Sequence, residues 1–228
     1  MLAGALIGWI AWMFLPQDYT AVAGLSIVVD YNHTGKLTDL EEDQIVGITE
    51  DILHSREIME TVFQASSESD YDRFFNRTRI TRTNSSWNLV LTGDDPEEIG
   101  KLALLWRDNA YDMLSDSLDH AVRADAFYNV LEGLTRCIRD SKAIPAADCP
   151  TDPEEITAGI DAAAKQLRKE KAAARGLSSA VILGAKDSGS LQIRPASRSA
   201  AADTFLGALC GLAAAFALVW FPVNRKQE

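Results

Sequence analysis

Two uninterrupted apolar runs lie near the ends of the chain, and the residues between them follow the periods of strands and helices. The second run, residues 205–223, contains no charged residue. At about 1.5 Å per residue it is long enough to cross a hydrocarbon core of about 30 Å. The first run, residues 2–15, is shorter. We interpret residues 1–16 and 205–223 as two transmembrane helices.

The charges beside the second run predict how the chain is oriented. Arg225 and Lys226 follow it directly, and basic residues beside a membrane segment favour the cytoplasmic side. Residues 224–228 are therefore expected to be a cytoplasmic tail, and residues 17–204 an extracytoplasmic domain. This predicts a two-pass protein of the cell (inner or cytoplasmic) membrane, in contact with the bilayer. A signal peptide is the alternative for the first run, although no Lys or Arg precedes it.

The periodicity between the two runs predicts an α+β domain. Alternating or β-branched stretches predict strands at residues 19–30, 77–82, 87–92, 179–183 and 191–194. Three- and four-residue spacings predict helices at residues 38–64, 95–140 and 151–176, with Gly47 and Ser55 as candidate kinks in the first. We expect helices packed on one face of a small mixed sheet, with strands from both chain ends. The last two helices are expected to form an antiparallel hairpin over about residues 95–176.

The cysteines favour a disulfide at the tip of this hairpin. Cys137 and Cys149 flank a loop that contains prolines, and an extracytoplasmic location permits oxidation. We predict a Cys137–Cys149 bridge, the alternative being two free thiols in a loop. Cys210 lies within the second apolar run and is interpreted as a small buried residue.

Charge and motif content exclude several functions. The chain has 33 acidic and 22 basic residues, for a net charge of −11, so no basic stripe is available to neutralise the phosphates of a nucleic acid. It contains no P-loop, no HExxH and no GxSxG sequence. The histidines His33, His54 and His120 stand apart from one another. We therefore predict a protein that is not an enzyme, with no catalytic residue and no cofactor.

One local pattern has the spacing of a calcium loop. Asp30, Asn32, Thr34, Lys36 and Glu41 occupy positions 1, 3, 5, 7 and 12 of an EF-hand-like loop. Only two of these are carboxylates, and a strand rather than a helix leads in. The alternative is a strand-to-helix turn in which Thr38 and Glu41 form a capping box. We favour the cap, and therefore no metal.

Small residues recur in the second apolar run. Gly207, Gly211 and Ala215 are spaced four residues apart, which places them on one helix face and allows a close approach of helices. This favours a homo-oligomer, although ordinary lipid-facing composition explains the same residues.

Several short motifs resemble the polysaccharide chain-length determinant family, also called polysaccharide co-polymerases. Residues 19–23 (YTAVA) are similar to its first strand, and residues 52–63 (ILHSREIMETVF) to its L-x-S-R-E-I-x-x-x-V helix. Asp95-Pro96, followed by a helix with Tyr111, resembles the next motif. Residues 191–196 are similar to its last strand. The chain departs from the family in having only Pro195 before its second apolar run.

The resemblance implies a non-catalytic membrane scaffold that assembles as a ring and regulates the chain length or export of a surface polysaccharide. Its partners would be further copies of itself and a polysaccharide polymerase or exporter. Two alternatives stay open: an accessory structural subunit of another membrane complex, and a sensor whose outer domain binds a ligand.

Overall fold

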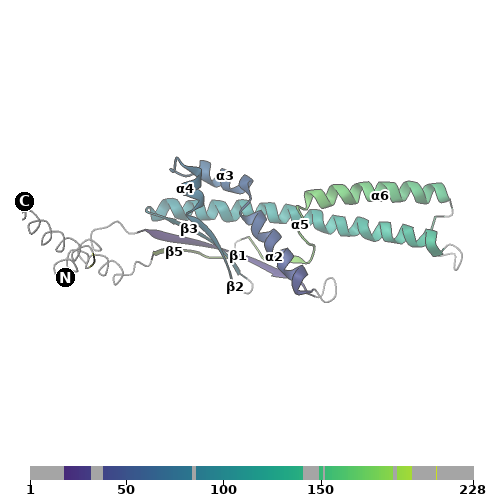
Figure 1. Cartoon of the computed structure of the whole chain (residues 1–228), viewed down its shortest axis with the longest axis horizontal. Helices are drawn as coiled ribbons and strands as arrows, with labels where there is room; N and C mark the ends of the chain where they lie inside the picture. The colour runs from purple at the N-terminus through teal and green to yellow at the C-terminus, as the bar shows by residue number, and fades with distance from the viewer. Residues whose placement is uncertain are drawn as a thin grey trace, which may run out of the picture.

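The structure is a computed structural model, and it describes residues 18–31, 38–83, 86–140, 149–150, 152–186, 189–196 and 209. The described residues form an α+β fold with one antiparallel sheet (Figure 1). In chain order the elements are β1 (Tyr19–Val29), α2 (Asp39–Leu53), α3 (Arg56–Gln64), α4 (Tyr71–Phe75), β2 (Thr78–Thr83), β3 (Ser86–Gly93), α5 (Pro96–Asp140), α6 (Pro153–Ala173), β4 (Val181–Leu183) and β5 (Leu191–Pro195). The short helix α4 lies between the helix predicted at residues 38–64 and the strand predicted at residues 77–82, where the periodicity predicts no element.

Strand β1 is the centre of the sheet. It pairs with β3 along one edge and with both β4 and β5 along the other, while β2 pairs with β3. Every one of these pairs is antiparallel, so the prediction of a mixed sheet is wrong. The reason is the helical hairpin: α5 runs in the same direction as β1, α6 reverses the chain, and β4 and β5 therefore run opposite to β1 (Figure 1). Strands from both chain ends do meet, through the pair Tyr19 and Pro195.

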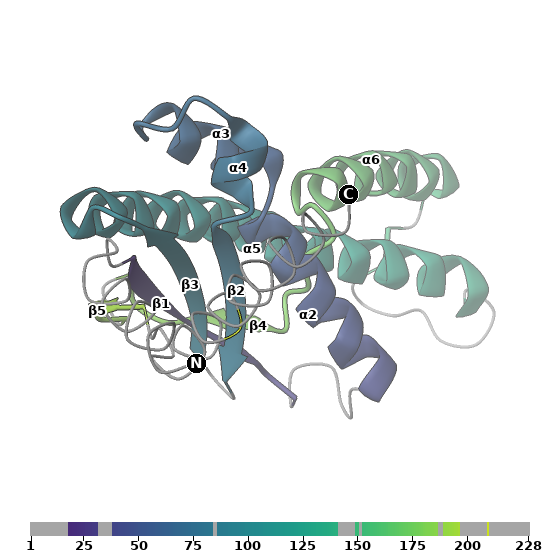
Figure 2. The ribbon, with the colours of Figure 1, turned by 60° about the vertical axis from the view of Figure 1, so that its left-hand side comes forward.

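The core lies between this sheet and α5. Alternate residues of β1 face the helix and are buried, among them Ala21, Ala23 and Leu25. The small side chains of Ala21 and Ala23 let α5 lie close to the strand, and Trp106 of α5 belongs to the same core with none of its surface exposed. In Figure 2, α5 lies above the strands, with α3 and α4 above it. The sheet therefore has one buried face and one that keeps partly exposed residues.

The predicted helix at residues 38–64 is broken into α2 and α3 at His54 and Ser55. The backbone carbonyl of Leu53, at the end of α2, accepts a hydrogen bond of 2.8 Å from the indole Nε1 of Trp106. Ser55 begins α3, and its hydroxyl donates to Sδ of Met113 at 3.5 Å. Both partners belong to α5. The break thus occurs where α5 supplies hydrogen-bonding partners, at the second of the two kinks that the sequence suggests.

The second half of α5 extends beyond the sheet and packs against α6 (Figure 1). Cys137 and Cys149 form a disulfide that joins the end of α5 to the chain leading into α6, so the predicted bridge is confirmed. The helix α6 starts with Asp152 accepting from the backbone N–H of Glu154 and with Pro153 in the first turn. After it, Gly176 has a φ of 83°, a left-handed conformation that suits glycine.

The predicted two-pass membrane location needs correction. Among the described residues, no helix is long and apolar enough to cross a membrane. The longest, α5, has 45 residues but carries charged side chains along its whole length. Apart from Leu209, the two runs interpreted as transmembrane helices lie outside the described residues. The location inferred from those runs is therefore withdrawn.

Candidate functional site

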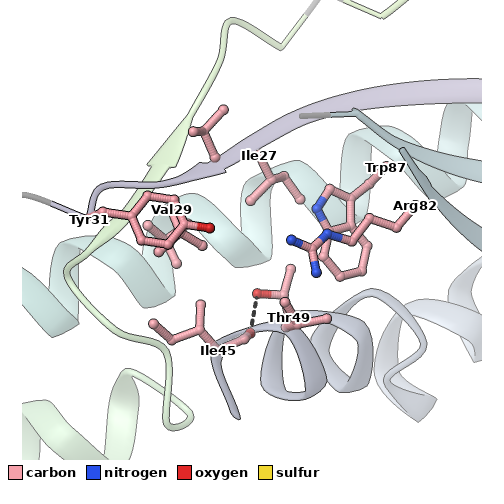
Figure 3. Close-up of a pocket in the computed structure, with 10 residues that line it drawn as sticks. Ile27, Val29, Tyr31, Ile45, Thr49, Arg82 and Trp87 are labelled. Atoms are coloured by element: carbon pink, nitrogen blue, oxygen red, sulfur yellow. Dashed lines mark hydrogen bonds between the residues drawn. The ribbon is translucent and has the colours of Figure 1, made fainter. Parts of the chain in front are cut away.

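A small pocket lies where α2 meets the sheet, near the Val29 end of β1 (Figure 3). Its apolar wall comes from Ile27, Val29, Ile45 and Trp87, and Tyr31 and Arg82 stand at its rim. The cavity volume is about 60 Å³. Pockets that hold drug-sized ligands measure roughly 300–1,000 Å³, so this one is too small for a ligand of that size.

The polar groups at the rim of this pocket are paired with one another. The guanidinium group of Arg82 lies over the Trp87 ring, 5.7 Å from its centroid, and its Nη2 is 3.4 Å from Oε1 of Glu42. A hydrogen bond to Glu42 raises the pKa of Tyr31. Thr49 is satisfied by the carbonyl of Ile45 at 2.7 Å. The cluster therefore ties β2 to α2, and its polar groups are used in doing so.

The motif that carries most of the family resemblance forms part of the core. Leu53 and Met59 are fully buried, and the His54 ring stacks on Trp106 with centroids 5.3 Å apart. Burial lowers the pKa of His54, because desolvation disfavours the charged ring. These residues dock the α2–α3 junction onto α5. The residues of the 52–63 motif are therefore explained by their packing in the core.

A charged cluster joins the two helices of the hairpin. Glu170 of α6 is only 8% exposed, and its Oε2 lies 2.6 Å from Nδ1 of His120 and 3.0 Å from Nε of Arg123, both on α5. Oδ1 of Asp116 is 3.8 Å from Nε2 of His120. The hydrogen bonds from His120, and then from Arg123, hold the pKa of Glu170 below its ordinary value. Sequence reasoning treated His120 as isolated, because its acidic partner is distant along the chain.

The candidate calcium loop is described only at its ends. Residues 32–37, which include Asn32, Thr34 and Lys36, lie outside the described residues. Glu41 accepts from the backbone N–H of Thr38 at 2.8 Å, and Thr38 Oγ1 accepts from the backbone N–H of Glu41 at 3.3 Å. These two bonds form the predicted capping box. The pKa of Glu41 is lowered by the bond from the Thr38 backbone N–H and by the Thr38 hydroxyl, which donates to Oε2 of Glu41 at 2.8 Å. Among the described residues there is no group of three or more potential metal-ligating side chains.

The remaining predicted packing residues cannot be placed. Gly207, Gly211 and Ala215 lie outside the described residues, so their proposed role in helix packing stays a prediction. The described residues therefore offer two clusters that join elements, at the α2 pocket and within the hairpin. Neither one combines a nucleophile with a general base or a cavity for a substrate.

Comparison with known proteins gives one kind of match. No family model matches the chain, and no curated protein matches it. Among solved structures, a chain described as a full-length bacterial polysaccharide co-polymerase is similar over 99% of this chain and 92% of its own length. The sequence identity is 14% and the TM-score is 0.33. Similarity at this level does not by itself assign a function.

Proposed function

We propose that this chain is a non-catalytic scaffold of the polysaccharide co-polymerase type. In this proposal several copies assemble as a ring and regulate the chain length or the export of a surface polysaccharide. They do so by organising a separate polymerase or exporter, with no chemical step of their own. The proposal rests first on the order of the motifs along the chain, which is that of the family the sequence resembles.

The observation that carries the proposal is the elongated form of the domain. The pairing of Tyr19 with Pro195 brings the entering and leaving chain together at one end. The α5–α6 hairpin projects from the other end, closed by the disulfide (Figure 1). A rod of this kind is suited to packing side by side with further copies. Such a scaffold needs extended surfaces rather than a deep cavity.

The hairpin carries apolar residues that such packing would cover. On α5, the side chains of Val122, Tyr128, Val130 and Ile138 are each about half exposed, at 51–52%. Single exposed apolar residues are common on protein surfaces. Here they recur along the part of α5 that extends beyond the sheet. In that part, α5 can bury apolar side chains mainly against α6. We assign them to the contact between copies.

The test combines assembly and polysaccharide length. The double variant Val122→Asp/Val130→Asp is expected to lower the mass of the native assembly, because each aspartate would have to be buried without a partner. In the organism of origin, the same variant is expected to shift the length distribution of the surface polysaccharide. The assembly is measured by mass photometry and the polysaccharide by gel electrophoresis.

The matched control is Asn129→Asp/Thr135→Asp, which adds the same charge to exposed polar positions of α5. It should leave both readouts unchanged. A monomeric wild-type chain, or a polysaccharide whose lengths do not change when the gene is deleted, would contradict the proposal.

A further inference from the structure

The sheet differs in charge from the rest of the molecule. The chain as a whole has a net charge of −11, yet the five strands contain no Asp or Glu. Their charged residues are Arg79, Arg82 and Arg194. The acidic residues belong to the helices and connecting segments. Pairing the strands therefore gathers a basic surface within an acidic protein.

Two of these arginines lie on the face of the sheet that points away from α5. Residues paired across antiparallel strands project to the same side, and the register aligns Arg79, Val90, Val22 and Gln192 in one row across the sheet. The pair Thr20 and Arg194 lies beside that row. We call the surface made by these six residues the open face. All six are partly or fully exposed.

The two arginines of the open face have no ion pair among the described residues. Nearly all other arginines there pair with a carboxylate, as Arg82 does with Glu42 and Arg123 with Glu170. Arg168, on α6, is the remaining described arginine for which neither an ion pair nor another interaction is found. In a chain with 33 acidic residues, two arginines without an ion pair, on strands that contain no Asp or Glu, make these strands more positive than the rest of the molecule.

The spacing of the two arginines favours an extended ligand. They lie on β2 and β5, which are three strand spacings apart, so their Cα atoms are separated by roughly 15 Å. A small anion could contact one of them but not both. A polymer with repeated anionic groups could contact both, and the second contact would then gain from a high effective concentration. Beside Arg194 the surface presents the hydroxyl group of Thr20 and the amide group of Gln192.

From this geometry we infer that the open face binds a polysaccharide that carries acidic groups. The arginines pair with its carboxylates or other anions, hydroxyl and amide side chains bond to its sugar hydroxyls, and Val22 and Val90 contact the apolar faces of its rings. This inference rests on the proposed function for the choice of a polysaccharide. It goes beyond that function by naming the charge of the polymer and the surface that holds it.

The test measures binding of two commercial polymers to the purified full-length chain. Polygalacturonate, which is anionic, is expected to bind, and dextran, which is neutral, is expected not to bind. The affinity for polygalacturonate should fall as salt is added, because ions screen exposed charges. In the Arg79→Gln/Arg194→Gln variant it should fall by about tenfold or more, since two charge-assisted contacts are lost.

Two further variants separate charge at this surface from charge in general. Arg168→Gln removes an unpaired arginine from α6 and should bind polygalacturonate as the wild type does. Arg79→Lys/Arg194→Lys keeps both charges and should retain most of the affinity. This variant also shows whether a loss of binding in the glutamine variant comes from the lost charges or from a loss of folding. Circular dichroism confirms that each variant is folded.

Several outcomes would overturn the inference. Equal binding of dextran, equal loss in the Arg168→Gln variant, or no loss in the Arg79→Gln/Arg194→Gln variant would each do so. So would a lower assembly mass in that variant, since the open face would then be a contact between copies. The proposed function is tested separately: if the polysaccharide lengths still depend on the chain while the open face does not bind polygalacturonate, only the present inference fails.

Discussion

The residue with the most evident electrostatic role is Glu170. It is buried where α5 meets α6, and a buried carboxylate is tolerated only when hydrogen-bonded or paired. His120 and Arg123 provide those bonds. Because they favour the ionised carboxylate, the pKa of Glu170 lies below its ordinary value of 4.5. The same contacts therefore make the stability of the hairpin depend on pH.

The sign of this dependence follows from linkage. A carboxyl whose pKa is lowered by folding adds stability above its unfolded pKa, and that stability is lost as the pH falls through its folded pKa. Glu170→Gln is therefore expected to lower the melting temperature at about pH 7, and the difference from wild type should shrink towards about pH 3. Asp161→Asn, at an exposed position of α6, is the control. A difference that stays constant over this range would show that Glu170 acts through packing alone.

The element that depends most on close backbone contact is β1 at Gly24. The residues of β1 before Gly24 pair with β5 and those after Ser26 with β4, and the segment joining β4 to β5 passes Gly24 at Gly189. A Cβ atom on Gly189 would collide with the backbone of Gly24, lying 2.7 Å from its Cα. Nη1 of Arg107 also contacts the Gly189 carbonyl, at 3.4 Å. Two glycines thus allow two strands to share one edge of β1.

A pair of glycine substitutions tests this contact. Gly189→Ala should destabilise the protein by about 2 kcal/mol or more, because backbone atoms must move to admit the methyl group. Gly133→Ala, within the last turns of α5 and with no atom within 4 Å of the added Cβ, should stabilise it by about 0.5–1 kcal/mol, since alanine favours the helix. Chemical denaturation measures both. Similar effects of the two substitutions would mean that the β1 edge tolerates a side chain at Gly189.

At the scale of the whole molecule, the net charge of −11 opposes assembly. Copies that pack side by side bring acidic helices together, and like charges repel over distances of about a Debye length. If apolar residues of the hairpin form the contact, raising the salt concentration from about 10 mM to about 300 mM should increase the assembled fraction. Sedimentation velocity measures that fraction. An assembly that dissociates as salt is added would instead be held by charge pairs between copies.

The sequence by itself determined most of the elements of this protein. The predicted strands lie within a few residues of β1 to β5, and the helix predicted at residues 151–176 contains α6, because periodicity is a local property. The Cys137–Cys149 bridge followed from two cysteines near one loop. The antiparallel sheet did not follow, since the direction of each strand depends on how the intervening helices reverse the chain.

The tertiary structure alone decided which distant residues meet. His120 and Glu170 are 50 residues apart, and neither neighbourhood predicts their contact. Arg79 and Arg194 belong to strands from opposite halves of the chain, and only the register of β2, β3, β1 and β5 places them on one face. Side chains alternate along a strand, so a shift of one residue would have turned either arginine to the buried side. Strand pairing is non-local, and for this reason the open face could be recognised only in the folded chain.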